Sequence, residues 1–132
     1  MINYQFNDKF QIVEVNVSGV ITIKDIIDHY YNISKDDSLP NNLKEIIDCR
    51  NAQFDIDLKN IDLTYKPVKK ALEAYDTIKE AILVDKPFET VVAMLFVRIN
   101  ANSKNYCCRV FSTEDASYNW LNLRSQKKLV QK

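Results

Sequence analysis

The sequence predicts a single α/β domain with a mostly parallel five-stranded sheet, in the order β-β-α-β-α-β-α-β-α. Two strand patterns come first, and short apolar runs then alternate with amphipathic segments of helical length. Strands that alternate with helices pair in parallel through crossovers, so only the first strand is expected to run antiparallel. A chain of 132 residues, with 46% hydrophobic and 27% charged residues, has the size and composition of one globular domain.

The two N-terminal strands are expected to form a hairpin. Apolar and polar residues alternate over 2–6, and a second strand over 10–17 carries three valines on one face. Asn7 and Asp8, which lie between the two strands, tolerate the left-handed backbone of a tight turn.

The first helix and the third strand follow this hairpin. Thr22 and Asp25 have the spacing of a capping box, which predicts a helix that ends near residue 35. Pro40 then breaks the chain, and a β-rich apolar run over 43–49 predicts the third strand. We expect a loop over 51–60.

The second helix is expected to begin near residues 62–64, because Pro67 then lies in its first turn, where the missing N–H is harmless. A strand over 78–84 leads into a third helix over 87–100, with proline at or near its first position.

The last predicted strand covers residues 106–111. Ser112 and Asp115 have the spacing of a helix cap, which predicts a fourth helix that carries Trp120. The order of these elements completes the predicted α/β pattern.

The helix predicted over 87–100 is apolar on nearly all sides. At about 100° per residue, its core face is expected to hold Phe88, Val91, Val92, Leu95 and Ile99. A helix that is apolar beyond its core face is covered by something else. We therefore expect Met94, Phe96 and Val97, together with Phe88, to form a homodimer interface. The alternatives are a groove for an apolar ligand and coverage by the last helix and the tail.

A polar rim is the other candidate site. Asp48 and Asp85 close predicted parallel strands, and ligands of open α/β sheets gather outside those strand ends. Arg50 and Glu114 are expected at the same rim. The alternative is that Asp85 caps the third helix and that Asp48 satisfies loop amides.

Four segments together resemble a known family. They are VSGVIT (17–22), IIDCR (46–50), KEAILVD (79–85) with AMLF (93–96), and VFSTEDA (110–116). In order and spacing they resemble the SpoIIAA-like group of small bacterial STAS-like proteins, over residues 1–123, which leaves a basic tail over 124–132. The resemblance implies sequentially ordered parallel strands in a STAS/CRAL-TRIO-type fold. The phosphorylated serine of that family has no counterpart, because residues 48–51 read DCRN.

Composition excludes several function classes. Acidic and basic side chains balance at 18 each, so no basic surplus points to nucleic acid. One glycine cannot build the common phosphate-binding loops, and one histidine without a C-x-x-C pair matches no zinc pattern. We therefore expect no cofactor, no metal and no catalytic residues, with Cys49 and His29 serving packing.

The chain is expected to be cytoplasmic and to lack a membrane span. Two of its three cysteines, Cys107 and Cys108, are adjacent in a predicted strand, where a disulfide between them would be strained. The N-terminus shows no signal-peptide pattern, and the longest apolar run, 91–97, is too short to cross a bilayer.

The function expected from the sequence is that of a non-enzymatic STAS-like interaction or regulatory module. It would self-associate through the helix over 87–100 or bind an unknown protein. The alternative is a carrier or sensor of a small apolar ligand or lipid, in a pocket lined by that helix and by Phe88 or Tyr75. The third possibility is an enzyme that uses Asp48, Cys49 and Asp85 at the strand ends.

Overall fold

The computed structural model describes residues 1–122 and contains one five-stranded sheet with the strands in sequence order, β1-β2-β3-β4-β5. The strands are β1 (Ile2–Asn7), β2 (Ile12–Ile21), β3 (Asn42–Phe54), β4 (Thr77–Leu83) and β5 (Tyr106–Phe111). Strand β1 pairs antiparallel with β2, and all other pairs are parallel. The predicted α/β class with a mostly parallel sheet is confirmed, and the predicted tail over 124–132 lies outside the described residues.

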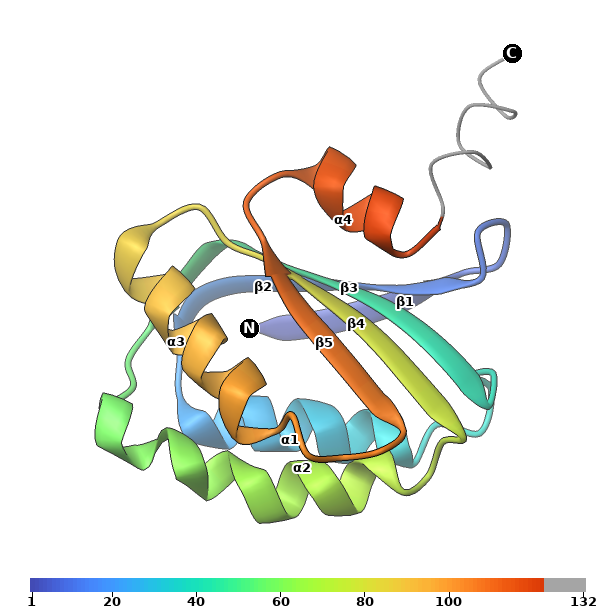
Figure 1. Ribbon diagram of the computed structural model, residues 1–132, viewed down its shortest axis with the longest axis horizontal. Coiled ribbons are helices and arrows are strands. Elements are labelled where there is room, and N and C mark those ends of the chain that lie inside the picture. The colour runs from blue at the N-terminus through green and yellow to red at the C-terminus, as the bar shows by residue number, and fades with distance from the viewer. Residues whose placement is uncertain (123–132) are drawn as a thin grey trace.

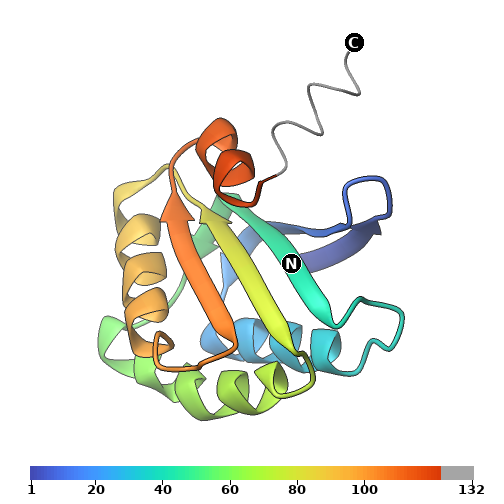
Figure 2. The ribbon, with the colours of Figure 1, turned by 45° about the vertical axis from the view of Figure 1, so that its right-hand side comes forward.

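Helices cover both faces of the sheet (Figures 1 and 2). They are α1 (Ile23–Ser34), the 3₁₀ helix η1 (Leu58–Thr64), α2 (Tyr65–Leu72), α3 (Pro87–Ile99) and α4 (Glu114–Trp120). Helices α1, α2 and α3 pack on one face over the larger core. Helix α4 covers the opposite face over a smaller core of Ile12, Ile46, Ala81 and Leu121.

Local signals at two helix starts are confirmed. The Thr22 side chain accepts a hydrogen bond from the backbone N–H of Asp25, and the Asp25 carboxylate accepts from that of Thr22 at 2.9 Å. Pro87 lies in the first turn of α3. The predicted cap of α4 is wrong by one residue, because Thr113 accepts from the backbone N–H of Ala116.

Strand β3 is longer than predicted. Its residues 51–54, expected to form a loop, pair with the end of β2 after a register shift between Asn16 and Ser18. Ala52 and Phe54 are buried there, so the extension adds to the larger core. Gly19, at φ +75°, supplies the one left-handed glycine of this stretch.

Helix α3 is rotated relative to the prediction. Its buried residues are Glu89, Val92, Ala93 and Phe96, whereas Phe88 and Val91 are exposed. The cause is Glu89, whose carboxylate accepts a hydrogen bond from the backbone N–H of Phe54 at 3.1 Å and so turns inward.

This rotation changes the expected interface. Phe96 is buried, and its ring stacks on that of Tyr30 at 5.8 Å between centroids, so it is not a surface residue. Val97 is half-buried against the larger core. Of the expected interface residues, Met94 and Phe88 are the exposed ones.

Candidate functional site

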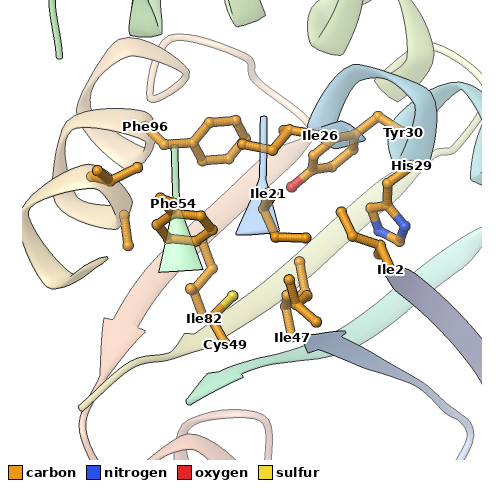
Figure 3. Close-up of a pocket in the computed structure, with 13 residues that line it drawn as sticks. Ile2, Ile21, Ile26, His29, Tyr30, Ile47, Cys49, Phe54, Ile82 and Phe96 are labelled. Atoms are coloured by element: carbon orange, nitrogen blue, oxygen red, sulfur yellow. The ribbon is translucent and has the colours of Figure 1, made fainter. Parts of the chain in front are cut away.

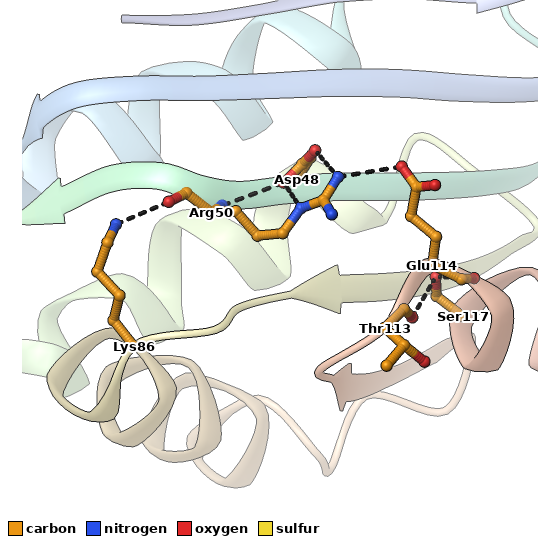
Figure 4. Close-up of polar contacts among 6 residues, drawn as sticks. All are labelled: Asp48, Arg50, Lys86, Thr113, Glu114 and Ser117. Atoms are coloured by element: carbon orange, nitrogen blue, oxygen red, sulfur yellow. Dashed lines mark hydrogen bonds and ion pairs between the residues drawn. The ribbon is translucent and has the colours of Figure 1, made fainter.

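The structure brings together three of the four residues of the predicted polar rim (Figure 4). Arg50 donates from Nε and Nη2 to the two carboxylate oxygens of Asp48, at 3.0 and 2.9 Å. The same Nη2 donates to Glu114 Oε1 at 3.0 Å. The Arg50 guanidinium lowers the pKa of Asp48, and Asp48 raises the pKa of Arg50. Asp85 is exposed and forms no ion pair with these three in the described chain, nor does it cap α3, whose N-cap is Lys86.

The polar rim and the neighbouring Lys86 join β3 to the starts of α3 and α4, and we call this set of contacts a clamp. Lys86 Nζ donates to the carbonyl oxygens of Arg50 and Ala52, at 2.7 and 3.2 Å, and so ties the start of α3 to β3 (Figure 4). Glu114 joins the start of α4 to the same strand. The cation at the centre is already matched by two carboxylates, which leaves it little capacity to recruit a ligand.

A cavity of about 60 Å³ lies on the other face, inside the larger core (Figure 3). Its lining surface is entirely apolar. The residues that line it are Ile2, Val17, Ile21, Ile26, His29, Tyr30, Ile47, Cys49, Phe54, Ile82, Val92, Ala93 and Phe96. The cavity therefore lies between α1, α3 and the sheet. Neither Phe88 nor Tyr75, the residues expected to line a ligand pocket, belongs to this lining.

One end of the cavity adjoins the protein surface. Ile2 and His29 also line a groove between β1 and α1, together with Asn3, Tyr4, Asp25, Asp28 and Asn32. Figure 3 shows Ile2 and His29 side by side, with Phe54 and Phe96 toward the other end. Ile2 is only half-buried. The shared residues show that the cavity and the groove lie next to each other.

Two buried carboxyl groups project from the face of the sheet that also lines this cavity. Glu45 on β3 and Glu80 on β4 are neighbours in the parallel register and are 1% and 0% exposed. Three groups donate to the same oxygen, Glu80 Oε1: the hydroxyls of Tyr30 and Tyr106, at 2.6 and 2.5 Å, and the Cys108 thiol at 3.3 Å.

The other oxygen, Glu80 Oε2, is buried and receives no hydrogen bond from a donor group in the described chain. Its neighbour is the Glu45 carboxyl, and two carboxyl groups bond to each other only when one carries a proton. Burial, followed by the charge of Glu45, raises the pKa of Glu80 well above its usual range. Burial also raises the pKa of Glu45 to about 7. The pair therefore retains a proton where ordinary carboxyl groups have lost theirs.

His29 connects the carboxyl pair to the cavity. Its Nε2 lies 2.9 Å from Glu45 Oε1, and the residue is 6% exposed. Burial lowers the pKa of His29 to about 4, so the imidazole is neutral near pH 7. The second ring nitrogen, Nδ1, makes no hydrogen bond within residues 1–122. A neutral imidazole with one free nitrogen can either donate or accept there.

The sequence analysis missed this carboxyl pair because it looked for acidic residues at strand ends. A signal was present in the alternation of the strands. Glu45 falls between Leu43 and Ile47 on the inward face of β3, and Glu80 has the same place between Ile78 and Ile82 on β4. A glutamate at an inward position of a buried strand needs a partner, which makes it a candidate functional residue.

His29 and Cys49, which were expected to serve packing, are both buried and both line the cavity. Burial raises the pKa of the Cys49 thiol to about 12, which keeps it protonated and unreactive at neutral pH.

Comparison with known proteins adds no family assignment: no family model matches the chain, and no curated protein matches it. Within residues 1–122, no helix is long and apolar enough to cross a membrane, and no group of three or more acidic, histidine or cysteine side chains is placed to hold a metal ion.

Proposed function

We propose that this protein binds a small apolar molecule in the cavity between α1, α3 and the sheet, as a carrier or a sensor. The observation that supports this best is the cavity itself, because protein cores are close-packed and rarely leave such a space. A predominantly apolar lining is common in small-molecule sites.

The size of the cavity limits the class of ligand. A cavity needs roughly 10–15 Å³ of this kind of volume to hold one water-sized group. About 60 Å³ therefore accommodates on the order of five such groups, which corresponds to a small ring or a short chain. A full lipid acyl chain exceeds this volume.

The shape of the lining indicates how a ligand enters. Ile2 and Ile26 are the half-buried lining residues, and Ile2 lies on the edge strand β1 beside the surface groove. Rotation of these two side chains opens a path without disturbing the strands in the middle of the sheet.

A filling variant tests the proposal. Ala93 lines the cavity, so Ala93→Leu places three further carbon atoms in it, and Ala93→Val is a milder form. Exposed Ala74→Leu is the matched control, because it adds the same atoms outside the core. Native mass spectrometry of freshly purified protein and thermal shift with benzene, cyclopentane and short alkanes are the measurements.

We expect a bound small molecule, or a rise in melting temperature with the panel, in the unmodified protein and in Ala74→Leu. Both effects are lost in Ala93→Leu and weakened in Ala93→Val. Unmodified protein that carries no bound mass and responds to no member of the panel would refute the proposal.

A second candidate function is self-association, which retains the interaction module expected from the sequence. The outer face of α3, defined as Phe88, Val91 and Met94, is 42%, 44% and 58% exposed. Leu58 and Leu63 of the neighbouring η1 are 40% and 59% exposed. Exposed apolar residues gathered on adjacent elements favour a protein contact.

Sedimentation velocity tests this candidate. Met94→Lys places a charge on the outer face of α3 without touching the core, and exposed Tyr31→Lys on α1 is the control. We expect a dimer that dissociates in Met94→Lys alone. Unmodified protein that stays monomeric at high concentration would exclude the dimer.

We also propose that the chain is STAS-like and cytoplasmic. The sequential strand order agrees with what the family resemblance implies, and the three cysteines are unpaired, as in a reducing compartment. Circular dichroism of protein purified with and without a reductant tests whether the cysteines are unpaired, as expected for a cytoplasmic protein. The spectrum is expected to be unchanged by reduction, and a spectrum altered by reduction would contradict it.

A further inference from the structure

A basic groove lies where β3, β4 and β5 begin, on the side of the sheet that α4 covers. It has a volume of about 340 Å³ and is lined by residues 42–44, 77–79 and 104–107, from strands that start side by side (Figure 2). Three of the lining residues, Lys44, Lys79 and Lys104, carry a positive charge, and none of the described lining residues is acidic. The groove therefore gathers positive charge in a chain whose charges balance overall.

The charges of these lysines are not paired with carboxylates in the described chain. No ion pair found within residues 1–122 includes Lys44, Lys79 or Lys104. Lys44 and Lys79 are partners in the parallel register, so two like charges lie next to each other on one face of the sheet. Like charges on neighbouring strands repel, which lowers the stability of the sheet unless an anion lies between them.

The end of α4 offsets only part of this repulsion. Lys44 Nζ donates to the carbonyl oxygen of Leu121 at 3.1 Å, and Lys79 Nζ donates to that of Trp120 at 2.7 Å. The C-terminal end of a helix carries at most about half a negative charge, which is less than the charge of two lysines. Each ammonium group has three N–H donors, so one bond to a carbonyl leaves two for a ligand.

We propose that the basic groove binds the phosphate group of a small soluble phosphorylated molecule. A phosphate dianion matches more than one lysine and accepts several hydrogen bonds at once, which makes lysine a common partner for it. Asn42 adds a neutral donor, because its Oδ1 accepts from the Thr77 hydroxyl at 2.7 Å and its amide nitrogen is left to donate. This site lies on the face opposite the apolar cavity, and the inference does not rest on the proposed function.

The volume of the groove indicates the size of the ligand. Roughly 10–15 Å³ of this kind of volume holds one water-sized group, so about 340 Å³ accommodates on the order of 25 such groups. A phosphate group fills a small part of this space. The remainder is large enough for a sugar, so a sugar phosphate is expected to bind more tightly than inorganic phosphate.

Two side chains can report on binding in the basic groove. Trp120 is the one tryptophan of the chain, and Lys79 Nζ lies 4.7 Å from the centre of its ring. A phosphate that binds Lys79 therefore changes the fluorescence of Trp120. Cys107 lines the groove and is exposed, so a bound ligand slows the reaction of its thiol with a reagent from solvent.

Fluorescence titration at constant ionic strength tests the proposal, because constant salt keeps the screening of the lysine charges the same throughout. The probes are ribose 5-phosphate, inorganic phosphate and ribose. We expect a saturable change with ribose 5-phosphate, a change at higher concentration with inorganic phosphate, and none with ribose. Ribose 5-phosphate, but not ribose, should also slow the modification of Cys107 by the neutral reagent 4,4′-dithiodipyridine.

A matched pair of variants assigns the binding to the groove. Lys104 is exposed and has no ion-pair partner within residues 1–122, so Lys104→Gln leaves the fold intact. Lys66→Gln is the control, because it removes the same charge from an exposed position of α2 on the other face of the sheet. Ribose 5-phosphate should bind about tenfold more weakly to Lys104→Gln, the effect of one charge-assisted hydrogen bond, and with unchanged affinity to Lys66→Gln.

Three results would overturn the proposal. The first is a titration with ribose 5-phosphate that does not saturate up to about 10 mM, which corresponds to negligible affinity. The second is equal affinity in Lys104→Gln and Lys66→Gln, or equal binding of ribose and ribose 5-phosphate. The third is binding to vesicles of phosphatidylcholine with phosphatidic acid and to neither soluble phosphate, because the ligand would then be a membrane surface. None of these results affects the apolar cavity, which is tested separately.

Discussion

Replacing Glu45 by glutamine is expected to change how the stability of the domain depends on pH. Glutamine has nearly the shape of a protonated glutamate, so the substitution keeps the packing and removes only the ability to ionise. Its amide also offers an N–H donor to the neighbouring Glu80 Oε2, which has no donor in the unmodified protein.

The size of the change in the free energy of unfolding follows from the pKa of Glu45, which burial raises from 4.5 to about 7. A carboxyl with a raised pKa in the fold contributes its full stability below pH 4.5 and loses it as the pH rises through 7. Each pH unit between the unfolded and the folded pKa of Glu45 lowers the free energy of unfolding by about 1.4 kcal/mol, so the total loss is about 3 kcal/mol. Glu45→Gln does not incur this loss.

His29 changes the free energy of unfolding with pH in the opposite direction. Burial lowers its pKa from 6.5 to about 4, so the folded state gains stability as the pH rises from 4 to 6.5. Glu80, whose pKa is also raised, loses stability with rising pH in the same sense as Glu45. His29 and Glu80 are present in both proteins, so the difference in the free energy of unfolding between Glu45→Gln and the unmodified protein isolates the effect of Glu45, and it is expected to grow by about 3 kcal/mol between pH 4.5 and 7.

Urea unfolding at pH 4.5, 5.5, 6.5 and 7.5 measures these free energies, with exposed Glu73→Gln as the control. The difference between Glu45→Gln and the unmodified protein should be small at pH 4.5 and favour the variant increasingly up to pH 7.5. A difference that stays constant within about 1 kcal/mol over this range would show that Glu45 is not perturbed as described.

Three further predictions concern other parts of the fold. Arg50→Ala opens the clamp with Asp48 and Glu114 but should leave the midpoint of urea unfolding nearly unchanged, because these side chains are partly exposed and screened; a midpoint lowered as far as in Glu89→Leu would contradict this. Glu89→Leu should lower the free energy of unfolding by about 1–3 kcal/mol, because it leaves the buried backbone N–H of Phe54 without an acceptor. Glu89→Gln keeps an acceptor and should lower it less, and equal losses in the two variants would refute the role of Glu89 as the acceptor for Phe54. Iodoacetamide at pH 8 should modify exposed Cys107 in the folded protein and spare the two other thiols, with peptide mass spectrometry as the readout; early modification of Cys49 would contradict its burial.

Several elements could be predicted because their causes are local. The capping box of Thr22 and Asp25 and the position of Pro87 depend on residues within one turn, and both are confirmed. The alternation of strand-like and helix-like segments indicated the α/β class for a similar reason, since each period is read within a short stretch of chain.

The orientation of α3 could not be predicted in this way. A helical projection places a charged residue outside by default, and Glu89 is the exception because its carboxylate completes the hydrogen bonding of Phe54. That contact joins residues 35 apart in the chain. The rotation it causes exposes Phe88 and buries Phe96, which reversed part of the expected interface.

The candidate site also has features that the sequence predicts and features that only the tertiary structure decides. The sequence by itself determined that Glu45 and Glu80 lie on the inward faces of their strands, because strand alternation assigns each position to one face. Only the tertiary structure decided that the two carboxyl groups are neighbours, and that His29 reaches one while Tyr30 reaches the other. The physical reason is that parallel register is set by packing across a helical crossover, which no short stretch of sequence contains.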